Sequence, residues 1–117
     1  MKKLPLLALV LLLAGCSSRS TDDWVGQLKA KDGVDRLHAI HALSDRPSDA
    51  HVVVPALKDT LKDRDPFVRR DAAIALGKLG PAAVPAAPAL RGLLNDRNRG
   101  VRKAASEALK KIETEPS

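Results

Sequence analysis

Apolar positions along the chain repeat with a period of 33 residues, and within each period they follow a helical spacing. The clearest copy runs from residue 49 to 81. Its apolar residues lie on one face of a helix over 54–61 and on one face of a second helix over 68–79. At a shift of 33 residues the following positions keep their residue type: Pro55, Ala56, Leu57, Leu61, Asp63, Val68, Arg69, Ala72, Ala75 and Leu76.

Three copies of the pattern occupy residues 22–48, 49–81 and 82–115, and each predicts a pair of helices. One pair of this size cannot bury its apolar face, whereas stacked pairs share a continuous core. We therefore expect an all-α stack of three pairs. The first copy has Asp35 where the second has Val68, and Arg46 where the second has Leu79, as expected of a terminal repeat.

Turn and cap residues place the helix boundaries in the same register of each copy. Asp32, Asp65 and Asn98 precede the three second helices, and their side-chain oxygens are suited to accept from a free helical N–H. Pro66 fits the first helical position, and Gly80 with Pro81 predicts the end of that helix. Three further prolines predict that the first helices begin nearby or kink at positions 55, 85 and 88.

The run from Asp65 to Gly80, D-P-F-V-R-R-D-A-A-I-A-L-G-K-L-G, resembles the HEAT-like repeat, in the short form first noted in phycobilin lyases. The third copy keeps Val101 and Arg102 but has Asn98 and Arg99 where the second has Asp and Pro. The resemblance implies a short right-handed α-solenoid whose second helices line a concave surface used for binding. It does not imply lyase chemistry, because a shared fold carries no reaction.

An export signal precedes the repeats. Lys2 and Lys3 are followed by an apolar run over 4–13 that is too short to span a bilayer as a mature helix. The sequence Leu13-Ala14-Gly15-Cys16 resembles the lipobox of bacterial lipoproteins. That resemblance implies removal of residues 1–15, acylation of Cys16 and a polar tether over 16–21. The alternative, an ordinary secretory signal, leaves Cys16 as a lone thiol.

This signal predicts where the protein is found. We expect it to be lipid-anchored at the bacterial cell envelope. Asp after the cysteine resembles the inner-membrane retention signal of enteric bacteria, and Ser17 stands there instead. We therefore expect the outer membrane, facing the periplasm, where the host has one. Acylation would consume the chain's single cysteine, so no intramolecular disulfide is expected despite an oxidising compartment.

The charge of the chain is basic and concentrated near its C-terminus. Loss of Lys2 and Lys3 reduces the 20 basic residues to 18, against 14 acidic ones. Export and the presence of only two aromatic residues argue against a nucleic-acid partner. The basic patch is a solvated helix face, a surface that orients the domain on an anionic membrane, or a contact site for an acidic protein or glycan. Its residues are Arg97, Arg99, Lys103, Lys110 and Lys111.

No motif in the chain predicts catalysis. There is no nucleophile elbow and no glycine-rich phosphate loop, so no enzyme activity, cofactor or small-molecule substrate is expected. His38 and His41 share a helix face, yet no carboxylate or thiol stands at a matching spacing for a metal. HEAT-like proteins with a di-iron site resemble one another in repeated His-Glu pairs. Here Ala39 and Ala42 follow the histidines, so we expect no metal.

Arginines at positions 36, 69 and 102 form a column with the repeat period. One interpretation is a ladder for an anionic ligand. The other, which we prefer, is that each guanidinium connects the loops of adjacent repeats, as HEAT-like families are known to do.

Facing away from Val68 and Leu76, the second helices carry a mixed apolar and basic arc that suits a partner protein. Its residues are either exposed for binding or partly buried between neighbouring helices. The proposed partner-binding residues are Leu37, Ile40, His41, Arg70, Ile74 and Lys103.

Three functions remain open from the sequence. The first is a membrane-anchored, non-enzymatic scaffold that binds another envelope protein. The second is an accessory subunit or degenerate enzyme of lyase or hydroxylase ancestry that handles a ligand or metal. The third is a purely structural role in stiffening an envelope assembly.

Overall fold

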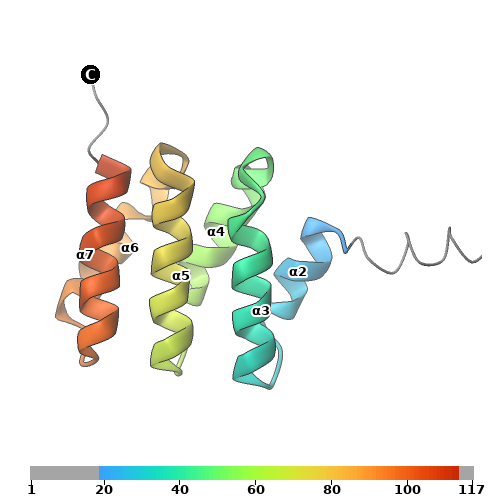
Figure 1. Ribbon diagram of the computed structural model, residues 1–117, viewed down its shortest axis with the longest axis horizontal. Coiled ribbons are helices and arrows are strands. Elements are labelled where there is room, and N and C mark those ends of the chain that lie inside the picture. The colour runs from blue at the N-terminus through green and yellow to red at the C-terminus, as the bar shows by residue number, and fades with distance from the viewer. Residues whose placement is uncertain (1–18, 114–117) are drawn as a thin grey trace, which may run out of the picture.

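The computed structural model describes residues 19–113, and these form two layers of helices with no strand. The second helices of the three pairs stand side by side in one layer, in front in Figure 1. They are α3 (Gly33–Ser44), α5 (Pro66–Leu79) and α7 (Arg99–Glu113). The first helices form the other layer: α2 (Thr21–Gln27), α4 (Ala50–Thr60) and α6 (Ala87–Gly92). The predicted short, all-α solenoid is confirmed.

Short 3₁₀ segments complete the connections: η1 (Pro47–Asp49), η2 (Gly80–Ala86) and η3 (Leu93–Asn95). The N-terminal ends of α3, α5 and α7 all lie at one edge of the stack, the lower edge in Figure 1. The predicted signal peptide over 1–15, the lipidation site Cys16 and the last two residues of the third copy, 114–115, lie outside the described residues.

The predicted N-caps are present in all three second helices. Asp32 Oδ1 accepts from the Val34 N–H at 2.9 Å, and Asp65 Oδ1 accepts from the Phe67 N–H at 2.8 Å. Asn98 Oδ1 accepts from Val101 at 3.1 Å. These bonds satisfy donors that have no partner within the helix.

Glycine and proline shape the first helices and end α5. Gly80 terminates α5 with a φ of 63°, a left-handed conformation that glycine adopts without steric cost. Pro85 lies in the 3₁₀ segment η2, so the third first helix, α6, begins only at Ala87. Pro55 lies inside α4.

One helical stretch of the described residues, Pro66–Asn95, is long and apolar enough to cross a membrane by length and composition alone. Half of that window is buried within the fold, and the chain turns at Gly80 between its two layers. Burial of this kind is typical of a core helix, so the stretch is weak evidence for a membrane span.

The core lies between the two layers and is centred on α5, which packs against α3, α4 and α7. The predicted apolar stripe of the second copy, Val54, Leu57 and Leu61, is buried. The described core begins at Leu28 and ends at Ile112. A chain that starts at Ser17 therefore contains the whole of this core.

Close approach of two second helices depends on Gly77. A Cβ added there would lie 3.0 Å from Ala108 Cα and 3.2 Å from Ala108 Cβ, because α5 and α7 pack backbone to backbone. Gly77 is accordingly buried although it lies on the side of α5 that faces away from the first helices.

At the N-terminal end of the stack, Arg46 occupies the repeat position of Leu79 and forms hydrogen bonds instead of apolar contacts. Its guanidinium donates to the hydroxyl of Thr21 at 2.9 Å and to the carbonyl oxygen of Arg19 at 2.7 Å. Within the described residues, a hydrophobic residue here would find no preceding repeat to pack on. The arginine instead fastens the end of α3 to the start of α2.

The arginine column connects the loops of successive repeats, as the structural interpretation predicted. Arg69 Nη1 donates to the carbonyl oxygens of Asp63 and Arg64 at 2.8 and 3.2 Å. Its Nε and Nη2 bind the Asp96 carboxylate of the next repeat at 3.0 and 3.1 Å. The guanidinium therefore holds its own loop with one nitrogen and the following loop with the other two.

Arg36 repeats the whole arrangement, and Arg102 repeats the part within its own loop. Arg36 Nη1 donates to the carbonyl oxygens of Ala30 and Lys31 at 2.7 and 2.9 Å, and its Nε forms an ion pair with Asp63 Oδ2 at 2.9 Å. Arg102 Nη1 binds the carbonyl oxygens of Asp96 and Arg97 at 2.7 and 3.1 Å.

The environment of Asp96 lowers its pKa. Burial, the largest influence, acts to raise the pKa, but it is outweighed by hydrogen bonds from Arg69 and the Asn98 N–H and by the charges of Arg69 and Arg102. The net pKa lies below the ordinary value of 3.8. Ionised Asp96 is thus the form that the folded state stabilises.

We predict that Gly77→Val lowers the free energy of unfolding by about 1–3 kcal/mol, because the added atoms collide with the backbone of α7. Gly26→Val is the matched control, since a Cβ at Gly26 meets nothing within 4 Å. It should change stability by no more than about 0.5 kcal/mol. Urea unfolding followed by circular dichroism measures both. Equal losses for the two variants would contradict the close packing of α5 on α7.

Asp96 should make stability depend on pH under acidic conditions. Its folded-state pKa is lowered, so its contribution is complete above the unfolded pKa and is lost as the pH falls through the folded value. The urea midpoint should therefore decrease between about pH 5 and about pH 3. Asp96→Asn should be less stable at neutral pH and lose less on acidification. Asp59→Asn, at an exposed aspartate, is the control and should follow the wild-type curve.

Candidate functional site

The outward surface of the second helices, which we call the α3–α5–α7 face, carries four of the six proposed partner-binding residues. His41, Ile74 and Lys103 are exposed, and Arg70 is half-buried. The structure brings His41, Arg70 and Ile74 together at the junction of α3 and α5. Lys103 lies on α7, the neighbouring helix.

The other two proposed residues are less accessible to a partner. Ile40 has 0% exposure and is a core residue, so its assignment to the binding surface was wrong. Leu37 is half-buried and packs against the core. Second helices contact both the first-helix layer and their own neighbours, so the buried arc is broader than one face. The continuous apolar patch expected from Leu37, Ile40 and Ile74 therefore does not exist.

A groove with a volume of about 250 Å³ lies between α3 and α5 on this face. Ile74, 44% exposed, contributes an aliphatic side chain, and Ala75 is buried. Lys78 and Asp45 form an exposed ion pair at 3.3 Å. The lining residues are His41, Ser44, Asp45, Asp71, Ile74, Ala75 and Lys78.

Asp71 organises the polar side of the groove. It is only 9% exposed, and its two carboxylate oxygens bind different helices. Oδ2 lies 3.0 Å from His41 Nε2 on α3, and Oδ1 lies 2.9 Å from Arg70 Nε on α5. The Arg70 guanidinium also lies over the Phe67 ring, 5.2 Å from its centroid, which favours a cation–π contact. His41 and Arg70 are thereby fixed in position.

Asp71 was not among the sequence candidates, although the repeat contained a signal for it. In the 33-residue register it aligns with Ala104 of the third copy, which is buried. An acidic residue at a buried position requires a partner, because an uncompensated carboxylate in the interior is costly. That requirement points to the adjacent arginine and to the histidine on α3.

The residues of the predicted basic patch are all exposed and are spread along α7. Arg97 and Arg99 lie at the start of α7, whereas Lys110 and Lys111 lie in its last turn. Eleven residues of helix separate Arg99 from Lys110, a rise of about 16 Å. Lys111 also lies beside α5, with its Cδ 3.6 Å from the position of a Cβ on Gly77. The five residues are therefore distributed over the length of the helix, and their action as one patch stays a prediction.

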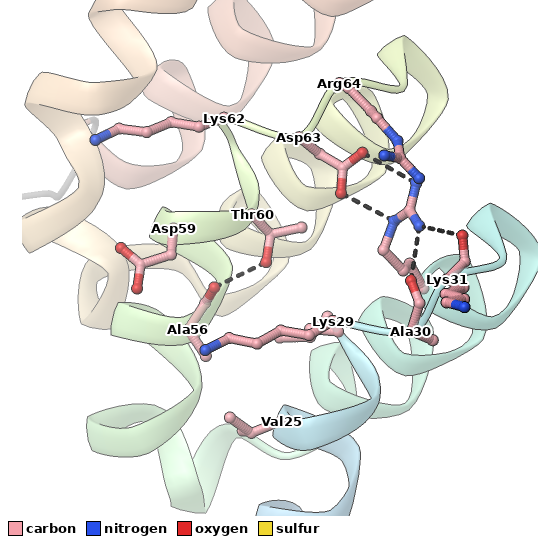
Figure 2. A pocket seen from close by; sticks show the side chains of 12 residues that line it. Val25, Lys29, Ala30, Lys31, Ala56, Asp59, Thr60, Lys62, Asp63 and Arg64 are labelled. Atoms are coloured by element: carbon pink, nitrogen blue, oxygen red, sulfur yellow. Dashed lines mark hydrogen bonds and ion pairs between the residues drawn. The ribbon is translucent and has the colours of Figure 1, made fainter.

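A second and larger groove, of about 590 Å³, lies between α2 and α4 and was not predicted from the sequence (Figure 2). Figure 2 shows the Thr60 hydroxyl donating to the carbonyl oxygen of Ala56, at 2.8 Å, so this hydroxyl is already engaged. Val25 and Leu28 supply apolar lining. Its charged lining is mostly basic: four exposed cations, Lys29, Lys31, Lys62 and Arg64, accompany buried Arg36 and the carboxylates of Asp59 and Asp63.

Among residues 19–113, no group of three His, Cys, Asp or Glu side chains is placed to hold a metal ion. His38 and His41 are both exposed on α3. His41 faces the Asp71 carboxylate, which supplies the one acidic contact it makes within the described part of the chain.

Comparison with known proteins identifies the repeat. A family model described as HEAT repeats matches residues 21–110, which include all three helix pairs. No curated protein matches the chain. The match covers most of the sequence, and the stacked helix pairs have the architecture that it implies. The chain therefore belongs to the HEAT repeat family, whose members generally act as non-catalytic protein-interaction scaffolds.

Proposed function

We propose that this protein is a lipid-anchored, non-enzymatic scaffold of the bacterial cell envelope, and that it binds a protein partner on the α3–α5–α7 face. The family supports the scaffold role. The lipobox resemblance at residues 13–16 supports the anchor. The observation that carries the binding surface is the α3–α5 groove, where an exposed aliphatic residue stands beside polar groups held by Asp71.

The fixed polar groups make this groove the better of the two protein-binding candidates. His41 and Arg70 are held by the same carboxylate, so ordering them on binding costs less side-chain entropy than ordering free side chains. Ile74 gives a partner apolar area to cover next to these groups. Binding energy in interfaces is concentrated in such small clusters that contain arginine and apolar anchors.

The charge of the face defines the partner chemistry. Arg70 and Lys103 lie on the α5 and α7 part of the face, and Lys103 is exposed. A complementary partner segment carries an aliphatic side chain for the groove and acidic groups toward these cations. Electrostatic complementarity of this kind selects the partner and speeds its association.

The anchor follows from the chemistry of acylation. One acyl chain gives only marginal membrane binding, whereas two or more chains, at about 0.8 kcal/mol per buried CH₂, give stable attachment. A lipobox cysteine at position 16 would place the attachment five residues before α2 begins at Thr21. The scaffold would then be held close to the membrane surface.

We predict that Cys16→Ser in the full chain leaves an uncleaved precursor or releases a soluble product. Cell fractionation and intact-mass measurement give the result. Ser17→Ala is the control and should remain in the membrane fraction at the acylated mass. A Cys16→Ser protein that is fully processed and still fractionates with membranes would show that the anchor is not at this cysteine.

Ile74→Asp should weaken partner capture about tenfold or more, because it removes the apolar anchor and adds charge beside Asp71. Val84→Asp is the control, since Val84 is 52% exposed on η2, outside the α3–α5–α7 face. In-cell crosslinking followed by quantitative mass spectrometry compares the proteins recovered with each variant, and circular dichroism checks that the fold is kept. If neither variant changes what is recovered, this face is not the binding surface.

A further inference from the structure

Basic side chains line the edge of the stack where each first helix joins its second helix. We call this the loop edge; it comprises loops 28–32, 61–65 and 96–98. Lys31, Arg64 and Arg97 occupy the same repeat position, and all three are exposed. Lys29 and Lys62, two residues earlier, share a second repeat position and are also exposed. This edge is at the bottom of Figure 1.

The carboxylates of the loop edge are already used by the fold. Asp32 and Asp65 cap second helices, and Asp63 and Asp96 bind Arg36 and Arg69 of the arginine column. Within residues 19–113, by contrast, the side chains of Lys31, Arg64 and Arg97 make no hydrogen bond or ion pair. The four carboxylates of the edge are therefore held by caps and arginines of the fold, whereas the three cations are exposed and, in this part of the chain, have no such partner.

The arginine column, Arg36, Arg69 and Arg102, also holds the backbone at these cations. The carbonyl oxygens of Lys31, Arg64 and Arg97 accept from the arginines of their own repeats at 2.9, 3.2 and 3.1 Å. Adjacent packed helices lie about 8–10 Å apart, so the three cations form a row with roughly that spacing. The row is held by the fold and does not have to be assembled when a ligand arrives.

Exposed apolar side chains accompany the row. Five large hydrophobic residues are exposed in the described part of the chain. Three of them, Val34, Phe67 and Leu94, are 40–57% exposed and lie within two residues of these loops in the sequence. Each stands three residues from a cation of the row in the sequence. Apolar side chains among cations contribute little to binding a nucleic acid in water. At the boundary between lipid headgroups and acyl chains they are buried, and this burial stabilises the bound state.

We propose that the loop edge is a membrane-docking surface that lies on an anionic leaflet. The cations face lipid phosphates, and Val34, Phe67 and Leu94 enter the headgroup boundary. The proposal rests on the proposed envelope anchor for the identity of the surface, because anchoring holds this edge near a leaflet. Nucleic acid is the less suitable polyanion, since the row carries a single aromatic residue and so lacks successive stacking platforms.

Vesicle sedimentation tests this proposal with the chain Ser17–Ser117, which lacks Cys16 and contains the whole described core. Partitioning is measured on phosphatidylcholine vesicles with and without phosphatidylglycerol, at about 50 mM and about 300 mM salt, which screens surface charge. The wild type should prefer the anionic vesicles at the lower salt. Because the anchor is absent, this result is independent of whether Cys16 is acylated.

Two double variants remove the same charge from different places. Arg64→Gln with Arg97→Gln removes two cations of the row and leaves the backbone carbonyls in place. It should weaken partitioning about 30-fold, which is two contributions of about 1 kcal/mol at 1.4 kcal/mol per tenfold. Lys78→Gln with Lys111→Gln, at the far ends of α5 and α7, should weaken it less than about threefold. Phe67→Ser should reduce the part of the binding that persists at high salt.

Equal losses for the two double variants would overturn the proposal, because net charge and not the row would then account for binding. Absence of any preference for phosphatidylglycerol would also overturn it. A duplex DNA competitor completes the test: binding to DNA without binding to vesicles would assign the edge to nucleic acid. The Cys16→Ser experiment fails or succeeds separately, so a wrong anchor and a wrong docking surface are distinguished.

Discussion

The fold depends on one repeated interaction, the arginine that joins two loops through a single planar group. A solenoid repeat contacts only its neighbours, so each loop between helices needs a local restraint. The guanidinium provides this restraint because its nitrogens point in fixed directions. Nε and Nη2 point toward the carboxylate of the next repeat, and Nη1 points toward carbonyl oxygens of its own loop. Lysine has no such fork and could not hold both loops at once.

Each contact between repeats in the arginine column runs from one repeat to the following one, so within the described residues the last arginine has no such contact. Arg36 and Arg69 each reach a carboxylate of the following repeat, whereas Arg102 in the last described repeat holds only the carbonyl oxygens of its own loop. At the opposite end Ala30 stands in the register of Asp63 and Asp96. Within the described residues, no arginine of an earlier repeat reaches this position, so a carboxylate there would lack the partner that Asp63 and Asp96 have.

Features set by local chemistry and by the repeat period could be predicted from the sequence. The caps at Asp32, Asp65 and Asn98, the helix end at Gly80 and the connecting role of the arginine column all follow from residues close to one another or from the 33-residue shift. Periodicity alone does not show how wide the buried arc of a helix is. Ile40 was misassigned because α3 is covered on its flank by α5 as well as by the first-helix layer.

The candidate site and the basic surface are formed by residues that are distant in the sequence and close together only in the folded structure. Asp71 is adjacent to Arg70 in sequence, yet its contact with His41 spans two repeats, so the center of the groove became visible only in three dimensions. The basic residues near the C-terminus are close in sequence but are spread along the length of α7. The exposed cations of the loop edge, Lys31, Arg64 and Arg97, are each separated by a full repeat.

The two proposed surfaces are compatible because of the direction of the second helices. In Figure 1 α3, α5 and α7 run away from the loop edge, so a leaflet under that edge leaves the α3–α5–α7 face roughly perpendicular to the membrane and open to the side. Ile74 is eight residues beyond Pro66, at the start of α5, or about 12 Å along the helix. That distance exceeds the Debye length of about 8 Å at physiological salt. A partner in the groove would therefore be selected mainly by the charges of the face and little by the membrane beneath it.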